Sequence, residues 1–355
     1  MVVIGKNIIG DGNPCFITFE IGPTHEGFES AKRLIKYASA SGANAVKFQI
    51  FDPDRLVADK KQTFSYKVLK DKKTGETEIV EENLYDILSR RCMNYNEWIE
   101  IKNFCDDLGV AFFSTVGFKE DIDLLEKIGC DSIKIASADI NHLPLIAYAA
   151  KTGACIQIDT GMATFDEIQN AISVIHSEKN QNIIIHHCPS GYPANKKNIN
   201  LKMIKTIKQK FNYPVAFSDH SPGKSMDIAA VALGANLIEK TITENRMNRS
   251  VEHIMSLEPD ELESFVNDIR EIENALGSEN REIMSEELKE RNKLRRSAFL
   301  VKPAKKGQRL SDCEIEFRRP GHGISPDKFQ LFQNYFLNKD IKGGEIIKKT
   351  DIDAQ

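Results

Sequence analysis

Several features that would point to particular classes of protein are missing from this chain of 355 residues. No apolar run approaches the about 20 residues of a membrane-spanning helix, and the N-terminal Met-Val-Val-Ile-Gly-Lys-Asn lacks the layout of a signal peptide. A net charge of −4 gives no electrostatic basis for binding nucleic acid or an anionic membrane surface. We therefore expect a cytoplasmic protein that binds neither.

The seven cysteines include no Cys-x-x-Cys pair, and they are odd in number and scattered. This pattern argues against a disulfide framework and against a structural zinc site. Cys155 lies in an apolar run and Cys130 directly precedes one. We expect both to be small core residues in a reducing compartment.

What the chain does have is a series of short apolar runs that end in polar or turn-forming residues. Val215-Ala216-Phe217 ends in Ser218-Asp219-His220, and Ile183-Ile184-Ile185 ends in His186-His187. Buried parallel strands show this pattern, and side chains at their C-terminal ends project into the mouth of an α/β fold. The histidines at the end of either run could therefore serve a site or simply bond a buried carbonyl.

Six further runs of this kind are Phe16–Glu20, Ala45–Gln49, Val110–Ser114, Ser132–Ala136, Cys155–Asp159 and Leu237–Lys240. Helical patterns such as Glu29–Ser41 and Phe165–Ile175 separate most of them. Eight strand–helix units in about 280 residues predict a (β/α)8 TIM barrel. An open doubly wound sheet is the alternative, but no glycine-rich dinucleotide fingerprint follows the first strand.

Two of these strands carry a lysine, Lys47 and Lys134, inside an otherwise apolar run. A buried lysine is costly unless it is paired or faces a ligand, so each is either a site residue or part of an ion pair. Polar residues end nearly every strand, at the rim where barrel enzymes have their active sites. The sequence therefore predicts an enzyme.

The segment Asp52–Asn83 is long, charged and without clear periodicity. A loop of this length in a compact domain is usually a functional lid or a disordered insertion. We expect an irregular segment here.

The chain is expected to divide into a barrel domain (1–280), a charged linker (281–296) and a C-terminal module (297–355). The last segment is too short for more strand–helix units, and Val301–Leu310 is loosely repeated at Asn338–Ile347. We predict a small β-rich module, with Arg318-Arg319-Pro320-Gly321 as a rigid turn. So small a domain buries little surface alone, and packing on a barrel would stabilise it.

At these residues the chain resembles the N-acetylneuraminate (sialic acid) synthase family. The resemblance implies a TIM barrel followed by an antifreeze-like (SAF, β-clip) domain. It also implies condensation of phosphoenolpyruvate with an amino-sugar aldehyde, giving a sialic-acid-like nonulosonate for surface polysaccharides and releasing phosphate. The matching motifs, in order along the chain, include Glu20-Ile21-Gly22, Lys47-Phe48-Gln49, Lys134-Ile135-Ala136-Ser137, Thr160-Gly161-Met162, His187-Cys188, Tyr192-Pro193, Ser218-Asp219-His220-Ser221, Ile238-Glu239-Lys240 and Arg319-Pro320-Gly321-His322-Gly323.

The chain also departs from the family pattern. The second histidine ligand of the family's metal is replaced by Thr241, and Gly-Pro-Asp-His by Ser250-Val251-Glu252-His253. The usual Thr-Pro-Phe is altered after Thr115, and Asp159, Asp139 and Ser190 stand where relatives have Ser, Glu and Asn. The changes at Thr241 and at Ser250–His253 alter the end of the eighth strand, where they bear on metal affinity and on the identity of the sugar.

Site roles follow from the resemblance. Glu20 would activate water, Lys134 would hold phosphoenolpyruvate, and His220 would be the protein ligand of a Mn2+ or Mg2+ ion. Arg319 would reach the sugar from the second subunit of a domain-swapped homodimer. Residues expected to bind substrate are Lys47, Gln49, Thr115, Ser137, Asp139, Asp159, Ser190, Tyr192, Ser218, Glu252 and Arg319.

Two other functions stay open. One is a phosphoenolpyruvate-using synthase of the 3-deoxy-sugar phosphate type, which shares the lysine-rich barrel but lacks the C-terminal domain. The other is a catalytically weakened paralogue that binds sugar without turnover, which Thr241 keeps in consideration.

Overall fold

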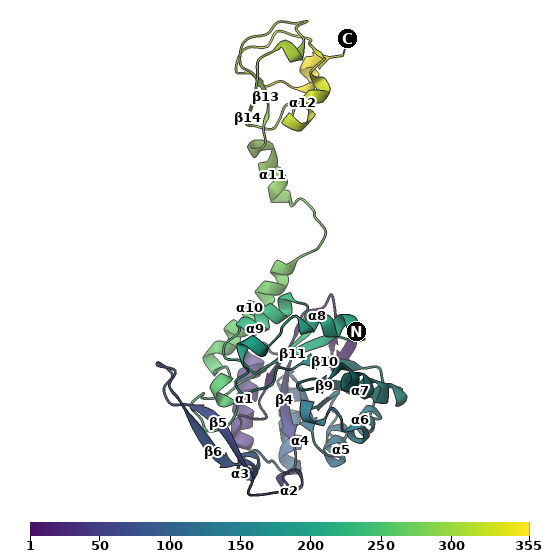
Figure 1. Cartoon of the computed structure of the whole chain (residues 1–355), viewed down its shortest axis with the longest axis vertical. Helices are drawn as coiled ribbons and strands as arrows, with labels where there is room; N and C mark the ends of the chain where they lie inside the picture. Colours follow the sequence, from purple (N-terminus) through teal and green to yellow (C-terminus); the bar gives the residue numbers. More distant parts are fainter. Residues whose placement is uncertain (355) are drawn as a thin grey trace. The chain divides into compact units, whose positions relative to one another are not determined.

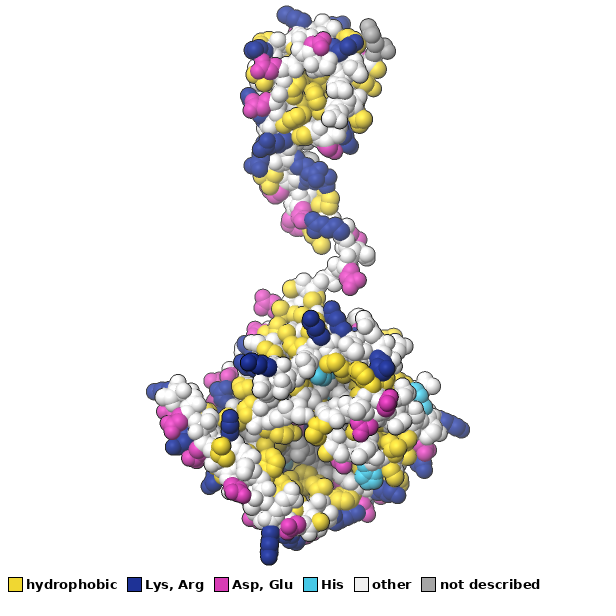
Figure 2. Space-filling view, viewed as in Figure 1, with side chains coloured by type: hydrophobic (Ala, Val, Ile, Leu, Met, Phe, Trp, Pro, Cys, Tyr) yellow, Lys and Arg dark blue, Asp and Glu magenta, His cyan; other side chains and the backbone are white. Residues whose placement is uncertain are grey.

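The computed structural model describes residues 1–354 and divides into two compact units, Met1–Gly277 and the part from Ser278 onward (Figure 1). Charged side chains of both signs are scattered over the visible surface of each unit (Figure 2). Among the described residues, none of the helices is both long and apolar enough to cross a membrane.

The first unit is a closed barrel of eight parallel strands, as predicted, and the alternative of an open sheet is wrong. The predicted strands agree with the observed ones to within two residues at each end. Strand β12 pairs with β3 and closes the barrel. The strands are β3 (Phe16–Glu20), β4 (Ala45–Ile50), β7 (Ala111–Val116), β8 (Ser132–Ile135), β9 (Cys155–Asp159), β10 (Ile183–His187), β11 (Val215–Asp219) and β12 (Leu237–Thr241).

Amphipathic helices surround these strands (Figure 1). Their starts carry local signals: Asn94 and Thr164 each form a capping box with a glutamate three residues on, which satisfies backbone N–H groups at the helix start. The helices are α1 (Phe28–Ala40), α4 (Tyr95–Asp107), α5 (Lys119–Lys127), α6 (Leu143–Ala150), α7 (Phe165–Ser177), α8 (Met203–Phe211), α9 (Ser225–Ala232) and α10 (Pro259–Leu276).

The two-residue period of the strands sorts their side chains into two faces. Large apolar residues such as Phe19 and Ile158 point outward and pack with the helices in the main core. The inward side chains at the start of the strands form a separate apolar cluster with the hairpin of β1 (Val2–Ile4) and β2 (Asn7–Ile9). This cluster closes the barrel at the N-terminal ends of its strands. It contains Val2, Ile4, Ile9, Phe16, Ala45, Phe113, Cys155, Ile184, Ala216 and Leu237.

The prediction of an irregular segment at Asp52–Asn83 is wrong. The segment forms α2 (Pro53–Leu56) and an antiparallel hairpin of β5 (Thr63–Leu69) and β6 (Thr77–Asn83), and α3 (Leu84–Ser89) follows. Its apolar residues are few but alternate correctly, since Tyr66, Val68 and Val80 form a small core with Ile87. The charged residues between them lie on the other face of the hairpin, and they make the two-residue period of the strands hard to recognise in the sequence.

The second unit is small and rich in β-structure, as predicted. The charged run before it, expected as a connector, contains α11 (Ser285–Leu294), none of whose residues is buried. A core including Ala298, Leu300, Leu310, Leu337 and Ile347 holds the unit together. Its elements are β13 (Ser297–Leu300), β14 (Ile315–Arg318), α12 (Pro326–Phe332), β15 (Phe336–Leu337) and β16 (Ile352–Asp353). Its assignment as an antifreeze-like domain stays a prediction.

Candidate active site

A cavity of about 500 Å³ is lined by residues at the C-terminal ends of the barrel strands. This is the end at which TIM-barrel enzymes have their active sites. Ten of the residues proposed from the sequence line it: Glu20, Lys47, Gln49, Thr115, Ser137, Asp139, Asp159, Tyr192, His220 and Glu252.

The other four proposed residues lie elsewhere. Lys134 and Ser218 are buried within the barrel and contact residues that line the cavity. Ser190 is exposed and lines a different cavity, together with Thr160. Arg319 is exposed in the second unit.

The centre of the site is a set of five buried charges, which we call the inner ion network: Glu20, Lys47, Lys134, Asp159 and Glu239. Lys134 Nζ donates to both oxygens of Glu239 at 2.7 and 2.6 Å and lies 3.0 Å from Asp159 Oδ2. Lys47 contacts Glu20 and lies 3.2 Å from Glu239 Oε1. Glu239 thus bridges the two lysines that the sequence singled out.

Within this network, the electrostatics favour the charged forms of Lys134 and Glu239. Burial alone would lower the pKa of Lys134, but the carboxylates of Asp159 and Glu239 raise it above its usual range. Burial alone would raise the pKa of Glu239, but Lys134 and Lys47 hold it well below its usual range. An incoming anion would therefore meet a protonated Lys134, whereas burial lowers the pKa of Lys47.

Glu20 ends β3, and the sequence around it explains its position. Its Oε1 accepts a hydrogen bond from the backbone N–H of Gly22 at 2.6 Å. A Cβ atom on Gly22 would lie 2.7 Å from both Glu20 Oε1 and Gln49, so only glycine permits this close approach. The motif Glu20-Ile21-Gly22 therefore fixes a carboxylate at the edge of the cavity.

His186 lies beneath the network and is held neutral. Burial, together with the charge of Lys134, lowers its pKa to about 3. Its Nε2 lies 2.8 Å from Gln157 Oε1 and its Nδ1 lies 2.9 Å from Ser218 Oγ. Because the Gln157 amide donates to Ser132 Oγ, its oxygen faces the ring, so Nε2 carries the proton. The histidine thereby positions Ser218 beside Lys134.

Sequence reasoning missed Glu239, His186 and Arg91 as site residues. Glu239 carried the same signal as Lys47, a charge inside an apolar strand, and His186 was noted without being selected. Arg91 follows α3 and lines the cavity, and nothing in the local pattern distinguishes it from the exposed Arg90.

Arg91 is unusual for an arginine because its side chain is buried. Its Nη1 donates to the backbone oxygen of Ile87 at 2.8 Å, and its Nη2 contacts Ser250 Oγ. Within residues 1–354, its Nε–H has no acceptor and no carboxylate lies within ion-pair distance of it. Burial lowers its pKa to about 10, so the guanidinium stays charged at neutral pH.

The residues around His220 fit a divalent cation. His220 Nδ1 lies 3.1 Å from the Pro189 carbonyl, and an Nδ1–H donating there leaves Nε2 free to coordinate. Glu252 accepts a hydrogen bond from Thr241 Oγ1 at 3.0 Å, and no cation pairs with its buried carboxylate in the described part of the chain. One imidazole and one unpaired carboxylate on the same cavity suit a hard ion such as Mn2+ or Mg2+.

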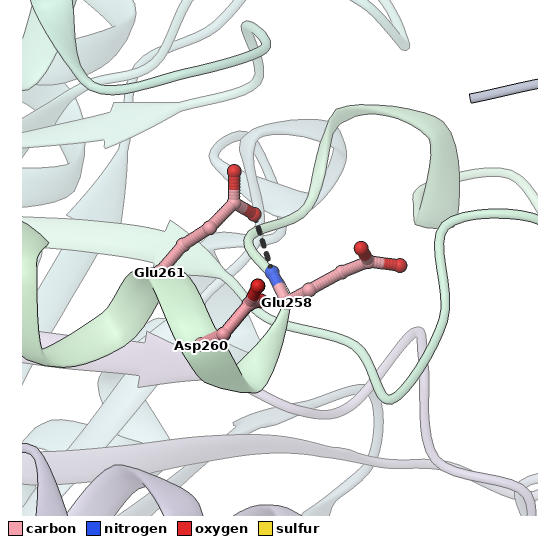
Figure 3. A group of neighbouring side chains, drawn as sticks. All are labelled: Glu258, Asp260 and Glu261. Atoms are coloured by element: carbon pink, nitrogen blue, oxygen red, sulfur yellow. Dashed lines mark hydrogen bonds between the residues drawn. The ribbon is translucent and has the colours of Figure 1, made fainter. Parts of the chain in front are cut away.

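A second group of acidic side chains, Glu258, Asp260 and Glu261, lies at the start of α10 (Figure 3). Glu261 accepts from the backbone N–H of Glu258 at 2.8 Å, which caps the helix. Glu258 and Glu261 also pair with Arg246, and Glu258 contacts Lys72. None of the three lines the cavity, and the contacts of Glu258 and Glu261 account for those two at the start of the helix.

Comparison with known proteins identifies the family. A sequence model described as the NeuB family matches residues 34–281. An N,N'-diacetyllegionaminic acid synthase of Campylobacter jejuni is 33% identical over 336 residues, covering 94% of this chain and 98% of that protein. A pseudaminic acid synthase of the same species is 32% identical over 339 residues, covering 95% of this chain and 96% of that protein.

Among solved structures, the N-acetylneuraminic acid (sialic acid) synthetase of Leptospira borgpetersenii, crystallised with citrate, superimposes with a TM-score of 0.71 at 30% identity. The match covers 82% of this chain and 95% of that one. The chain therefore belongs to the NeuB family, the sialic acid synthases that its motifs resemble, and is a condensing synthase that uses phosphoenolpyruvate.

Proposed function

We propose that this protein condenses phosphoenolpyruvate with an amino-sugar aldehyde, forming a sialic-acid-like nonulosonate and releasing inorganic phosphate. The observation that carries the proposal is the inner ion network beneath the cavity. Two buried lysines that share the Glu239 carboxylate, Lys47 and Lys134, would pair with the phosphate and carboxylate of phosphoenolpyruvate. The hydroxyl of Ser137, which lines the cavity, adds a neutral donor nearby.

The reaction needs two bonds formed and one broken. The methylene carbon of phosphoenolpyruvate attacks the aldehyde carbon, whose oxygen takes a proton and becomes a hydroxyl. Water adds to the carbon that bears the phosphate, and the bond between that carbon and the phosphate oxygen then breaks to give a ketone and phosphate. Glu20, whose carboxylate is fixed by Gly22, accepts the proton of that water.

His220 and Glu252 would hold the divalent ion proposed here, as Mn2+ or Mg2+. Bound there, it would supply Lewis acidity to the aldehyde oxygen and orient the sugar. Thr241 does not replace the family's second histidine as a ligand in this proposal. Instead its hydroxyl orients the Glu252 carboxylate, and Tyr192, whose ring lies 4.8 Å from that of His220, borders the sugar.

We further propose that Arg319 contacts the sugar from the second subunit of a homodimer. Its exposure and the rigid Arg-Pro-Gly turn that presents it support this role. Arg319→Ala and Glu20→Gln chains, each inactive alone, should regain activity when refolded together, because some sites would then carry both native residues. Absence of recovered activity in verified mixed dimers would contradict the shared site.

The proposed function is tested by measuring phosphate release from phosphoenolpyruvate with a panel of amino sugars. We expect release only with an unphosphorylated amino sugar, loss of activity after chelation and recovery with millimolar Mn2+ or Mg2+. Release with phosphorylated aldoses alone would indicate a 3-deoxy-sugar phosphate synthase. Sugar binding without any release would indicate a weakened paralogue.

A further inference from the structure

Lys134 is fully engaged by the protein's own side chains. Its ammonium group carries three N–H donors, and four oxygens lie within reach of its Nζ. These are both oxygens of Glu239 at 2.7 and 2.6 Å, Asp159 Oδ2 at 3.0 Å and Ser218 Oγ at 3.2 Å. The lysine side chain is completely buried. An anion can therefore pair with Lys134 only if one of these three partners releases it.

Of the three partners, Asp159 is the one placed to leave. Glu239 holds Lys134 with both oxygens and also lies 3.2 Å from Lys47. Asp159 holds the lysine with one oxygen and is the more open of the two carboxylates, with 12% of its side chain exposed against 5% for Glu239. Ser218 does not line the cavity, whereas Asp159 does. Asp159 therefore lies where a bound anion would meet Lys134.

The second oxygen of Asp159 has a competitor for its hydrogen bond. Asp159 Oδ1 lies 3.1 Å from Ser218 Oγ, but the single hydroxyl proton of Ser218 also faces His186 Nδ1 at 2.9 Å. Because His186 carries its own proton on Nε2, its Nδ1 is an acceptor for that hydrogen. Asp159 is thus held mainly through Lys134, the group that the substrate needs.

The charge of the inner ion network gives the reason for a proton. The network contains three carboxylates and two lysines, so it has one net negative charge when all five groups are ionised. Phosphoenolpyruvate adds a phosphate and a carboxylate, and like charges brought together in a buried site repel each other strongly. A proton taken up by one carboxylate would remove one of these negative charges as the anion binds.

The neutral groups that face Asp159 do not take up this proton. His186 on β10 is kept neutral because burial, together with the charge of Lys134, lowers its pKa to about 3, and both of its ring nitrogens are engaged. Beyond the end of β10, burial raises the pKa of both Cys188 and Tyr192, so each already holds its proton at neutral pH.

The other two carboxylates of the network are held in their ionised forms. Burial alone would raise the pKa of Glu239, but Lys134 and Lys47 hold it well below its usual range. Glu20 accepts a hydrogen bond from a backbone N–H at 2.6 Å and contacts Lys47, and both contacts favour its carboxylate form. Asp159 is therefore the remaining carboxylate of the network that could accept the proton.

We propose that Asp159 takes up one proton from solvent when phosphoenolpyruvate binds, withdraws from Lys134 and donates its new O–H to the bound anion. Lys134 then pairs with an anionic oxygen of phosphoenolpyruvate and keeps Glu239 as its second partner. In the free protein, Asp159 occupies the place of that oxygen and keeps the buried lysine paired. This inference rests on the proposed function, because it requires the inner ion network to be the phosphoenolpyruvate site.

Calorimetry counts the proton. Phosphoenolpyruvate is titrated into the protein with saturating Mg2+ and without sugar, in buffers that differ in ionisation enthalpy, and the slope of binding enthalpy against ionisation enthalpy gives the protons exchanged. At about pH 8 we expect about one proton per site to be taken up by the wild type, and none by Asp159→Asn or Asp159→Ser, whose side chains are neutral. Asp260→Asn makes the same change at an exposed position off the cavity and should keep the uptake.

The pH dependence of the affinity gives a second measure. Between about pH 7 and 9, the ratio of the wild-type Kd to the Kd of Asp159→Asn should rise by up to about tenfold per pH unit, because only the wild type has to acquire the proton. Comparing the two proteins at each pH removes the contribution of Lys47, which they share.

The absence of proton uptake by the wild type would overturn the inference. Uptake that persists in Asp159→Asn would also overturn it, because the proton would then go to another group such as Lys47. Either result, with phosphate release intact in the wild type, would leave the proposed function standing, whereas failure of phosphoenolpyruvate to bind the wild type would overturn both. Circular dichroism confirms that each variant is folded, and the wild-type titrations need no variant.

Discussion

Two buried ion networks lie on opposite faces of β12, which pairs with β11, and only one of them belongs to the active site. The inner network includes Glu239 and borders the cavity. The outer network consists of Asp219, Asp227 and Lys240, and is sealed between these strands and α9. Glu239 and Lys240 are neighbours in the sequence, but the two-residue period of a strand points them to opposite faces.

The outer network has a structural explanation. Lys240 contacts Asp219 and donates to the Ser221 carbonyl at 2.6 Å. Asp219 in turn accepts from the backbone N–H of Ser221 at 2.9 Å, which fixes the turn that follows His220. Buried charge alone therefore does not mark an active site. What distinguishes the inner network is that its carboxylates and Lys47 line a cavity.

The largest expected effect is a loss of stability when the lysine of the outer network is removed. Lys240→Met leaves Asp219 and Asp227 buried without a cation, which should cost about 3–5 kcal/mol in the free energy of unfolding. Urea unfolding measures this loss, and Lys151→Met, at an exposed position, is the control. The folded variant should bind phosphoenolpyruvate as the wild type does, and a weakened affinity would give the outer network a role in the site.

The matching change in the inner network should act on binding. Lys134→Met keeps the length and apolar stem of the side chain but removes a charge-assisted hydrogen bond, so phosphoenolpyruvate binding should weaken by about 1.5–3 kcal/mol. Calorimetry on the folded variant measures this. Unchanged affinity would show that Lys134 serves only Glu239 and Asp159.

Two buried groups, His186 beneath the inner network and Asp227 in the outer network, should make stability depend on pH with opposite signs. The pKa of His186 is about 3 in the folded protein, whereas that of an unperturbed histidine is about 6.5. Below pH 6.5 the unfolded chain binds a proton at this histidine that the folded chain does not. The free energy of unfolding therefore decreases by about 1.4 kcal/mol for each unit by which the pH falls. His186→Gln should flatten the pH dependence of urea unfolding between pH 7 and 5. His176→Gln, an exposed control, should not, and parallel curves for wild type and His186→Gln would contradict the assignment.

The smallest expected effect concerns Asp227, whose contribution to stability should change with pH in the opposite direction to that of His186. Burial, with the nearby Asp219, raises its pKa despite Lys240, so the folded state favours the protonated form and this contribution to stability is lost as pH rises. Asp227→Asn removes the buried charge while Lys240 keeps Asp219 as a partner. We expect a gain of about 1 kcal/mol at pH 8, measured by urea unfolding, and little change at pH 4. A clear loss at pH 8 would show that Asp227 is needed as a charge.

The same alternation explains what the sequence could predict. Apolar runs closed by polar residues located all eight strands, and lysines inside such runs identified Lys47 and Lys134, because a charge in a buried strand needs a partner. Glu239 was overlooked because its neighbour Lys240 is charged too, and only the choice of face separates them. Arg91 could not be found as a site residue, since it follows the short helix α3 and meets the cavity only when distant segments fold together.

The hairpin of β1 and β2 has a consequence for the order of events in the reaction. With Val2, Ile4 and Ile9 it closes the end of the barrel at which the strands begin. Reactants and products therefore share the entrance at the other end. If phosphoenolpyruvate binds at the inner ion network and the sugar binds between it and the entrance, phosphoenolpyruvate has to enter first. Released phosphate then leaves from the deepest position, after the nonulosonate, and steady-state kinetics should show it competing with phosphoenolpyruvate and not with the sugar.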